Sequence, residues 1–433
     1  MIRWTAPFAS RPVRGLVVVP GSKSASARSL LLAALADGGS VLTGVLDSRD
    51  TALMRAGLTT LGATFSDLPD GRLQVHPATS LQGGGTINCG LAGTVMRFLP
   101  ALAALATPPT AFIGDEAASL RPVAGLLAAL AALGAEVSEP YHLPFSVGGA
   151  PGVLGGPVVV DASVSSQFIS ALLLAAPRFP HGLEITHSGG SLPSLPHIDM
   201  TAALLARRGV LLDRPAPCTW RVEPGPIAAL DEVVEPDLTN AATLLAAALV
   251  TGGEARTAWP EASVQAADEL AGVLAAFGAT ISYSIDPVVG RQLTVSGAGA
   301  GAGGGGVRGA DVDLNAVSEL TPVAAALAAL ADRPSRIRGV AHIRGHETNR
   351  LAALAAELGA LGVEVTETPD GLVIVPAPRH GGTWHTRNDH RLAHAGALLG
   401  LVTAGVELDD VGCTTKTLPD FPGLWSRLLG GSA

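Results

Sequence analysis

Lysine and aromatic residues are scarce in this sequence. Of its 28 basic residues only two are lysine, Lys23 and Lys416, and aromatic residues make up 4% of the 433 positions. A nucleic-acid-binding protein needs a clustered basic face with aromatic side chains, and the net charge of −9 argues against one. Because arginine supplies nearly all other positive charge, the two lysines indicate positions where a compact ammonium is chemically required.

Cysteine is equally rare, and long apolar runs are missing. Cys89, Cys218 and Cys413 lie far apart, without the spacing of a disulfide framework or a zinc site, so we expect thiols in a reducing compartment. No apolar stretch approaches the roughly 20 residues of a membrane span. The first residues are broken by Pro7 and Pro12, unlike a signal peptide. These features predict a cytoplasmic protein.

Alanine, leucine and glycine are abundant, in a chain too long for one ordinary core. Helical patterns that end in Leu-Gly-Ala or a close variant, and lead into an alternating apolar strand, recur about every 70 residues. Their glycines are Gly62, Gly134, Gly209, Gly278 and Gly362, with a partial sixth copy at Gly430. Glycine suits the left-handed position that follows a helix. The six copies predict two domains of three α/β units, and they are too long for solenoid repeats.

Apolar periodicity predicts the individual elements. The expected helices are 30–36, 123–133, 167–175, 240–248, 264–277, 320–330 and 350–358. The expected strands are 16–19, 158–160, 293–295 and 372–375. The glycine run 297–309 lacks the Gly-Lys-Ser/Thr of a nucleotide phosphate loop, so we expect a flexible connection there.

Residues 20–30 join a strand to a helix through Pro-Gly, and then place Lys23, Ser24 and Arg28 in the first helical turns. Helix N-termini carry unpaired N–H groups and positive partial charge, which favour an anion. The alternative is a helix start that is merely capped by serine.

Similar polar clusters mark other helix starts. They lie at 90–97, 114–122, 163–167, 194–199, 345–350, 388–391 and 414–420. Each alone is more often a solvated helix start than a site, but together they suit a small substrate with phosphate and carboxylate groups. Glu319 is a candidate base, or it only favours the helix N-terminus. Neither a metal-ligand spacing nor a nucleophile signature is present.

In their order along the chain, these motifs resemble those of the 5-enolpyruvylshikimate-3-phosphate synthase family (3-phosphoshikimate 1-carboxyvinyltransferases). The motifs are 21–24 with Arg28, then 92–97, 120–122, 165–167, 347–350, 388–391 and 416–420. The resemblance implies an α/β (α+β) fold of two domains, each an inside-out barrel of three βαβαββ-type repeats. Domain I would comprise 1–16 and 232–433, domain II would be the insertion 17–231, and the cleft between them would close on the substrates.

The resemblance also implies an activity: the enolpyruvyl group of phosphoenolpyruvate passes to the 5-hydroxyl of 3-phosphoshikimate, and phosphate leaves. Glu319 would be the base at the hydroxyl, Glu347 the acid at the methylene carbon, and Lys23 and His390 would complete the catalytic set. The implied 3-phosphoshikimate contacts are Lys23, Ser24, Arg28, Ser165, Ser166, Gln167, Ser194, Glu319 and His346. The implied phosphoenolpyruvate contacts are Lys23, Gly93, Arg121, Gln167, Arg350, Arg391 and Lys416. No cofactor, metal, nucleic acid or membrane is implied, and we expect a monomer.

Some positions depart from the commonest family pattern. Glu319 stands where aspartate is frequent, and further departures are Leu91 for Asn, His197 for Tyr, His342 for Asn and His346 for Lys. The roles of His342 and His346 therefore stay open. Two alternatives are a UDP-N-acetylglucosamine 1-carboxyvinyltransferase and a non-catalytic relative that binds phosphorylated metabolites. The first usually has Asn after the motif lysine and a reactive cysteine near Arg121, and the second would lack the catalytic side chains.

Overall fold

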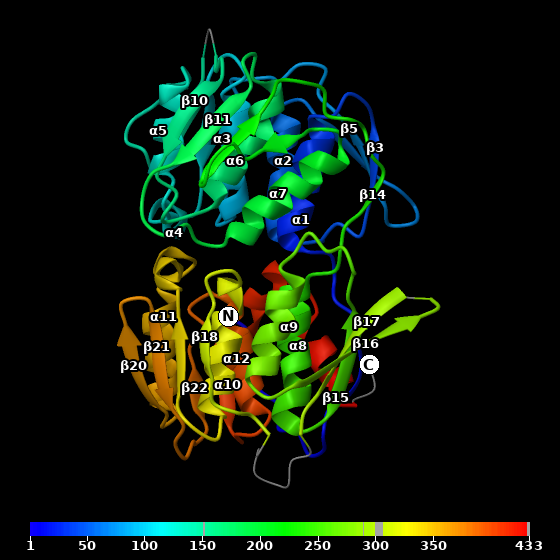
Figure 1. Ribbon diagram of the computed structural model, residues 1–433, viewed down its shortest axis with the longest axis vertical. Helices are drawn as coiled ribbons and strands as arrows, with labels where there is room; N and C mark the ends of the chain where they lie inside the picture. Colours follow the sequence, from blue (N-terminus) through cyan, green and yellow to red (C-terminus); the bar gives the residue numbers. More distant parts are fainter. Residues whose placement is uncertain (150–151, 289, 299–305, 431–433) are drawn as a thin grey trace. The chain divides into compact units, whose positions relative to one another are not determined.

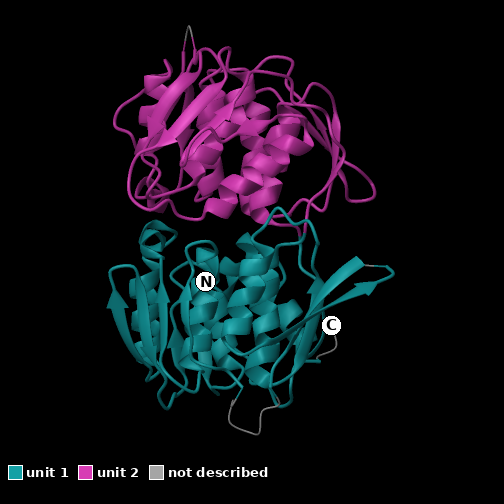
Figure 2. Cartoon of the chain, viewed as in Figure 1, with its two compact units in different colours: residues 1–20, 236–433 teal, residues 21–235 magenta. Residues whose placement is uncertain are grey.

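The computed structural model describes residues 1–149, 152–288, 290–298 and 306–430 (Figure 1). The chain divides into two compact units (Figure 2). Unit 1 comprises Met1–Pro20 and Pro236–Ala433, and unit 2 comprises Gly21–Glu235. The domain limits that the resemblance implies, at 16/17 and 231/232, stay a prediction. Each unit contains three small sheets with helices between them, which confirms the predicted six-unit α/β architecture.

Every four-stranded sheet has the same order: a parallel pair of strands, followed by two strands added antiparallel. In unit 2 the sheets are β14 (Glu232–Val233), β3 (Ser40–Thr43), β5 (Leu73–His76), β4 (Thr64–Asp67); β6 (Thr86–Asn88), β7 (Thr110–Ile113), β9 (Phe145–Gly148), β8 (Glu136–Val137); and β10 (Gly156–Val160), β11 (Leu183–His187), β13 (Thr219–Val222), β12 (Leu212–Asp213). The first strand of the first sheet, β14, comes from the far end of the unit and pairs with β3.

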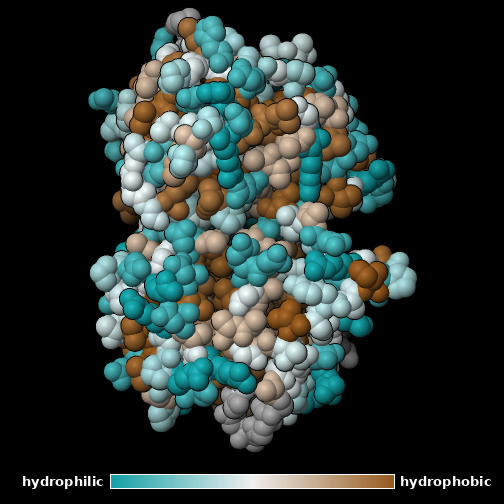
Figure 3. Space-filling view, viewed as in Figure 1, coloured by the Kyte–Doolittle hydropathy of each residue, from teal (hydrophilic) through white to brown (hydrophobic). Residues whose placement is uncertain are grey.

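Unit 1 repeats this order with strands from both of its segments. Its sheets are β2 (Arg14–Val17), β15 (Glu254–Ala258), β17 (Gly290–Ser296), β16 (Thr280–Asp286); β18 (Asp311–Asp313), β19 (Ser335–Arg338), β21 (Gly371–Val375), β20 (Glu364–Thr368); and β22 (Gly382–Trp384), β23 (Val406–Leu408), β1 (Trp4–Thr5). The hairpin of β16 and β17 ends in exposed apolar residues, among them Ile285 and Val288, and this end is brown in Figure 3. A patch of this size is ordinary for a protein surface.

Three helices in each unit are buried along almost their whole length, and we call them the inner helices. They are α1 (Lys23–Ala34), α3 (Gly93–Ala103) and α6 (Gln167–Ala175) in unit 2, and α8 (Leu238–Thr251), α10 (Thr321–Ala329) and α12 (His390–Gly400) in unit 1. Within unit 1, α10 packs against both α8 and α12 (Figure 1). A helix that is apolar all round is typical of such a core position. Small alanine and glycine side chains let these helices approach closely, which accounts for the alanine-rich composition.

The outer helices bury one face only. They are α2 (Arg49–Thr60), α5 (Ala124–Ala132), α7 (Leu195–Arg207), α9 (Ala267–Ala276), α11 (Arg350–Ala360) and α13 (Phe421–Leu428), and shorter helical turns are α4 (Glu116–Ser119), η1 (Ala176–Arg178), η2 (Ser318–Leu320), η3 (Ala341–Gly345) and η4 (Val411–Lys416). The repeated glycines follow these helices with left-handed backbones, for example φ +105° at Gly62 and +101° at Gly278. This confirms their predicted capping role, because other residues are strained at such angles.

Most helices begin within two residues of their predicted starts, and α9 is the exception. Helix α1 begins at Lys23, so the motif residues occupy its first turns as predicted, and the Ser22 hydroxyl caps it by accepting a hydrogen bond from Ala25 N (3.4 Å). Helix α9 begins at Ala267 and not at residue 264. The preceding Gln265 is instead used for tertiary bonds: its side chain bonds to Leu238 N (3.0 Å) and Pro236 O (2.8 Å).

The remaining expectations can be checked only where the structure describes the chain. Part of the predicted loop at 297–309 lies outside the described residues, namely 299–305. Among the helices that are described, none is long and apolar enough to cross a membrane. In the same parts of the chain, no three His, Cys, Asp or Glu side chains are grouped so that they could hold a metal ion.

Candidate active site

In unit 1 the N-termini of the inner helices lie together, because hydrogen bonds join their first turns. Arg391, in the first turn of α12, donates from Nη1 to Asn240 Oδ1 at the start of α8 (2.8 Å). The same guanidinium donates from Nε to Glu319 Oε2, which lies in η2 directly before α10 (3.3 Å). Three helix ends with positive partial charge therefore converge, which favours an anion at this end of the unit.

Arg350 lies at the centre of this cluster, at the start of α11, and is fully buried. It donates to both Asp389 oxygens (2.7 and 3.2 Å), to Glu319 Oε2 (3.0 Å) and to Glu347 Oε2 (3.0 Å). Burial acts to lower its pKa, but the charges of the three carboxylates outweigh burial and raise the pKa well above its usual value. The guanidinium therefore keeps its charge and has a fixed orientation.

Glu347 bridges two cations. One carboxylate oxygen accepts from Arg350, and the other accepts from Lys416 Nζ at the end of η4 (2.6 Å). Both members of the Lys416 pair are largely shielded from solvent, with side chains 13% and 6% exposed. The structure thus brings together one of the chain's two lysines and the predicted acid, which lie 69 residues apart in the sequence.

Glu319, the predicted base, contacts the same cations and a histidine. Its Oε1 lies 3.2 Å from His346 Nδ1, and its Oε2 lies 3.0 Å from Arg350 and 3.3 Å from Arg391. Burial acts to raise the pKa of Glu319, but Arg350, the bond to His346 and the charge of Arg391 together hold it well below the usual range. Glu319 is therefore ionised at neutral pH and can accept a proton.

Of the two histidines with open roles, His346 contacts this carboxylate and His342 contacts the preceding residue, Ser318. The rings of His342 and His346 meet edge to face at 5.7 Å, and His342 Nε2 is 2.9 Å from Ser318 Oγ. Both departures from the commonest family pattern therefore fall next to the candidate base.

His390, a predicted catalytic residue, is buried at 1% exposure in the first turn of α12. Its Nδ1 lies 3.8 Å from Asp389, and its ring meets that of His394 at 5.9 Å. His394 is also fully buried, and burial together with the charges of Arg391 and Arg350 holds its pKa well below the usual value. The structure thus places both rings in the interior beside Asp389 and Arg391.

In unit 2 the inner helices also carry polar residues at their starts, and these are joined by Arg97. Its Nη1 donates to Gln167 Oε1 at the start of α6 (2.8 Å), and its Nε and Nη2 donate to Pro122 O (3.0 and 2.9 Å). Lys23 and Ser24 are partly exposed in the first turn of α1. The predicted donors of α1 and α6 thus lie at helix N-termini, as the motif analysis expects.

Arg121 approaches the start of α3 very closely. Its Nη1 donates to Leu91 O (2.9 Å), and a Cβ atom added to Gly93 would lie only 2.9 Å from its Nη2. A side chain at position 93 would therefore require the guanidinium to move away from the start of α3. Within the described part of the chain, the buried Nε of Arg121 has no hydrogen-bond partner. A buried donor without a partner is rare in native structures.

The remaining predicted contacts of unit 2 lie at the starts of α6 and α7. The Ser165 hydroxyl accepts from Gln167 N (3.3 Å), and Ser166 directly precedes α6 and is buried. Ser194 precedes α7 in a left-handed conformation, with φ +51°. This is an uncommon backbone state for serine.

Arg28, a predicted substrate contact, is 1% exposed and bonded to protein groups. Its guanidinium donates to Thr201 Oγ1 (2.8 Å), Ser170 Oγ (3.3 Å), His197 O (3.1 Å) and Ser24 O (2.9 Å). Burial lowers its pKa to about 9. In this structure Arg28 therefore ties α1 to α6 and α7, and its contact with substrate stays a prediction.

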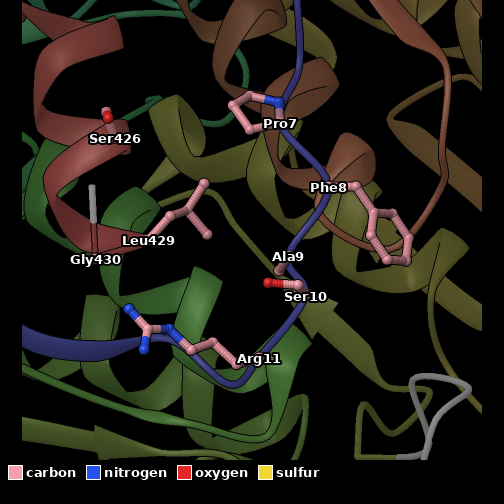
Figure 4. A pocket seen from close by; sticks show the side chains of 8 residues that line it. All are labelled: Pro7, Phe8, Ala9, Ser10, Arg11, Ser426, Leu429 and Gly430. Carbon is pink, nitrogen blue, oxygen red and sulfur yellow. The ribbon is translucent and has the colours of Figure 1, made fainter. Parts of the chain in front are cut away.

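The sequence alone did not indicate the central position of Asp389 or the contact of Asn240 with Arg391. The only signal for Asn240 was its place three residues after Asp237, which accepts from its backbone N (2.9 Å) as a helix cap. A separate pocket of about 350 Å³ in unit 1 is lined by Pro7, Phe8, Ala9, Ser10, Arg11, Ser426, Leu429 and Gly430 (Figure 4). This lining includes none of the predicted site residues.

Comparison with known proteins adds three likenesses. The sequence model of the family described as EPSP synthase (3-phosphoshikimate 1-carboxyvinyltransferase) matches residues 8–425. Two solved structures of EPSP synthase from Acinetobacter baumannii are 21% and 20% identical, with TM-scores of 0.81 and 0.79, and each comparison covers 98% of both chains. The enolpyruvyl transferase NikO from Streptomyces tendae is 17% identical with a TM-score of 0.75, over 97% of this chain and 96% of that one. At these identities the structural matches show a common fold.

Proposed function

Because the chain belongs to the EPSP synthase family, we propose that it transfers the enolpyruvyl group of phosphoenolpyruvate to the 5-hydroxyl of 3-phosphoshikimate and releases phosphate. In the cell this reaction would serve aromatic amino-acid biosynthesis by the shikimate pathway, with a monomeric enzyme in the cytoplasm.

One observation carries the proposal: three cations and two carboxylates converge at the inner-helix ends of unit 1. Arg350, Arg391 and Lys416 contact Glu319 or Glu347 at 2.6 to 3.3 Å. Cations at helix N-termini suit the phosphate and carboxylate groups of phosphoenolpyruvate. The two carboxylates beside them suit the two proton transfers that the reaction requires.

The proposed chemistry begins at the methylene carbon of phosphoenolpyruvate. Glu347, which would enter this step in its protonated form, donates a proton to this carbon, and C2 gains cationic character. The 5-hydroxyl oxygen bonds to C2, while Glu319 accepts the hydroxyl proton. The resulting tetrahedral intermediate then loses phosphate, and the Glu347 carboxylate takes back one proton of the methyl group, which restores the double bond in the product. Lys23 and Lys416 would stabilise the charge of the leaving phosphate.

The groups of unit 2 would hold the phosphates and hydroxyls of the substrates. Lys23, Ser24, Ser165, Ser166, Gln167 and Ser194 are the proposed contacts of 3-phosphoshikimate. Arg121, beside Gly93, would bind phosphoenolpyruvate. The buried Nε of Arg121, which lacks a partner in the described chain, supports this role because a ligand oxygen would satisfy it.

The test is phosphate release by the purified chain with phosphoenolpyruvate and each of two acceptors. We expect release with 3-phosphoshikimate and none with UDP-N-acetylglucosamine. Release with UDP-N-acetylglucosamine alone would assign the chain to the alternative transferase activity. Binding of phosphoenolpyruvate without release for either acceptor would favour the non-catalytic relative.

A further inference from the structure

Asn240 lies at the point where three elements of the unit 1 cluster meet. It is fully buried in the first turn of α8. Its Oδ1 accepts from Arg391 Nη1 of α12 (2.8 Å), and its Nδ2 donates to Thr417 O, the residue that follows Lys416 (3.2 Å). The Thr417 hydroxyl lies 3.4 Å from the same Oδ1. One side chain thus contacts a candidate substrate-binding arginine and the segment that carries a candidate substrate-binding lysine.

The orientation of this amide is fixed by its partners. A guanidinium only donates hydrogen bonds, so the amide oxygen has to face Arg391. A carbonyl only accepts, so the amide nitrogen has to face Thr417 O. If the amide oxygen and nitrogen exchanged places, neither neighbour would be satisfied. Among side chains of this size, only Asn offers one acceptor and one donor in this arrangement.

The charge of Asn240 matters as much as its shape. Arg350 has Asp389 as a buried ionic partner, whereas Arg391 has the neutral Asn240 in the corresponding role. The cluster as a whole contains the cations Arg350, Arg391 and Lys416 and the carboxylates Glu319, Glu347 and Asp389, whose formal charges cancel. A further negative charge next to Arg391 would make the net charge of the cluster negative, which disfavours an anionic ligand.

We propose that Asn240 is a positioning residue for phosphoenolpyruvate binding. Its neutral amide fixes the position of Arg391 and links it to the Lys416 segment, and it neutralises the positive charge of neither residue. This inference rests on the proposed function, in which Arg391 and Lys416 bind phosphoenolpyruvate. It assigns Asn240 to the donor substrate and leaves the affinity for 3-phosphoshikimate to other residues.

The experiment compares N240D and N240A with the matched control T243V. Thr243 lies one turn later on α8, is also fully buried, and its hydroxyl donates to Thr239 O within the same helix (3.2 Å). Asp keeps the size of Asn and the oxygen that accepts from Arg391. It also adds a negative charge and places an oxygen, instead of the amide nitrogen, opposite Thr417 O. Ala removes both bonds without adding charge.

We expect N240A to weaken phosphoenolpyruvate binding about tenfold to a hundredfold, since a hydrogen bond to a charged group is lost. We expect N240D to weaken it further, about a hundredfold or more, because of the added charge. The KM for 3-phosphoshikimate should change less than threefold in both variants, and T243V should match the wild type within about twofold. Calorimetry with phosphoenolpyruvate and with inorganic phosphate measures binding directly, and initial rates give the two KM values.

A purely structural role predicts a different result, in which both KM values and the melting temperature change together. That outcome would overturn the proposal, as would N240D binding phosphoenolpyruvate like the wild type. If N240A fails to fold, N240D still decides the question because it keeps the side-chain volume. If the wild type binds phosphoenolpyruvate but never releases phosphate, the proposed function fails while the binding comparison among the variants still tests Asn240.

Discussion

The two units use one scaffold for different electrostatic arrangements. In unit 1 the central guanidinium, Arg350, is surrounded by carboxylates at 2.7 to 3.2 Å. In unit 2, Arg28 and Arg121 donate hydrogen bonds to backbone carbonyls and hydroxyls. The charge of Arg350 is therefore balanced by carboxylates, whereas these bonds of Arg28 and Arg121 are to neutral dipoles.

This difference arises from very few residues. Both units are built from the same repeat, and in both the polar side chains lie in or next to the first turns of inner helices. The fold provides converging helix ends in either case, and the side chains at those ends decide whether the ends suit proton transfer or simple anion binding. In our proposal unit 1 carries the acid and the base, and unit 2 supplies positive charge and hydroxyl donors.

Removing the acid should give the largest effect. We expect Glu347→Gln to lower the rate of phosphate release about a thousandfold or more, because the amide cannot protonate the methylene carbon. Binding of phosphoenolpyruvate should persist, since Arg350, Arg391 and Lys416 are retained. Single-turnover phosphate release and calorimetry measure the two quantities separately. A rate within tenfold of the wild type would remove Glu347 from the role of acid.

Removing the lysine of unit 2 tests the other side of the comparison. Lys23→Ala should lower phosphate release about a hundredfold to a thousandfold, because the charge of the leaving phosphate loses a cation. The fold should persist, since Lys23 is a partly exposed residue in the first turn of α1. Circular dichroism checks the fold. Turnover at the wild-type rate would exclude Lys23 from the site.

One buried carboxylate in each unit allows an effect on stability to be distinguished from an effect on activity. Asp389 in unit 1 and Glu232 in unit 2 are both buried partners of buried arginines, Arg350 and Arg208. We expect Asp389→Asn and Glu232→Gln each to lower the free energy of unfolding by about 3–5 kcal/mol, because a buried arginine loses a buried carboxylate partner.

Only the unit 1 variant should also lose phosphate release at temperatures where both variants stay folded. Denaturant titration gives the stabilities, and the phosphate assay gives the rates. Equal loss of phosphate release in the two variants would contradict the functional difference that we propose between the units.

Acid should destabilise unit 1 through a buried histidine, and this is the smallest expected effect. The folded-state pKa of His394 is held well below 6.5, so below pH 6.5 the unfolded chain binds a proton that the folded chain does not. Its contribution to stability is therefore present above about pH 6.5 and decreases as the pH falls, by at most about 1.4 kcal/mol per pH unit.

His394→Leu should remove this slope, so that stability falls about 2 kcal/mol less between pH 6.5 and pH 5 than in the wild type. Denaturant titrations at both pH values measure the difference, and Thr243→Val is a control with an unchanged slope. Identical slopes for the wild type and His394→Leu would contradict the assignment.

The repeat pattern could be read from the sequence, whereas the links between repeats could not. Gly62 and Gly278 identify helix ends by local backbone chemistry alone, so the six-unit fold was predictable. The bond between Asn240 and Arg391 joins positions 151 residues apart, and it depends on how two inner helices pack. Apolar periodicity alone would start α1 near residue 30, but the Pro-Gly turn and the serine cap before Lys23 indicate the true start.

The burial of Arg28 was likewise invisible, since no local pattern distinguishes an arginine that binds ligand from one that fastens helices together. The motif places it in the second turn of α1, where either environment is possible. Its bonds go to Ser170 and Thr201, 142 and 173 residues further along the chain.

Unit 1 is built from two segments of the chain, and this also sets the order in which its strands can pair during synthesis. Strand β2 pairs with β15, and β1 pairs with β23, where Trp4 lies opposite Leu408. The ribosome therefore completes all of unit 2 before either N-terminal strand has a partner. At about 5–20 residues per second, β1 waits about 20 to 80 s for β23. During that interval the nascent N-terminal strands are open edges, available to another chain, so the period of greatest risk of misassembly comes while unit 2 is already free to fold.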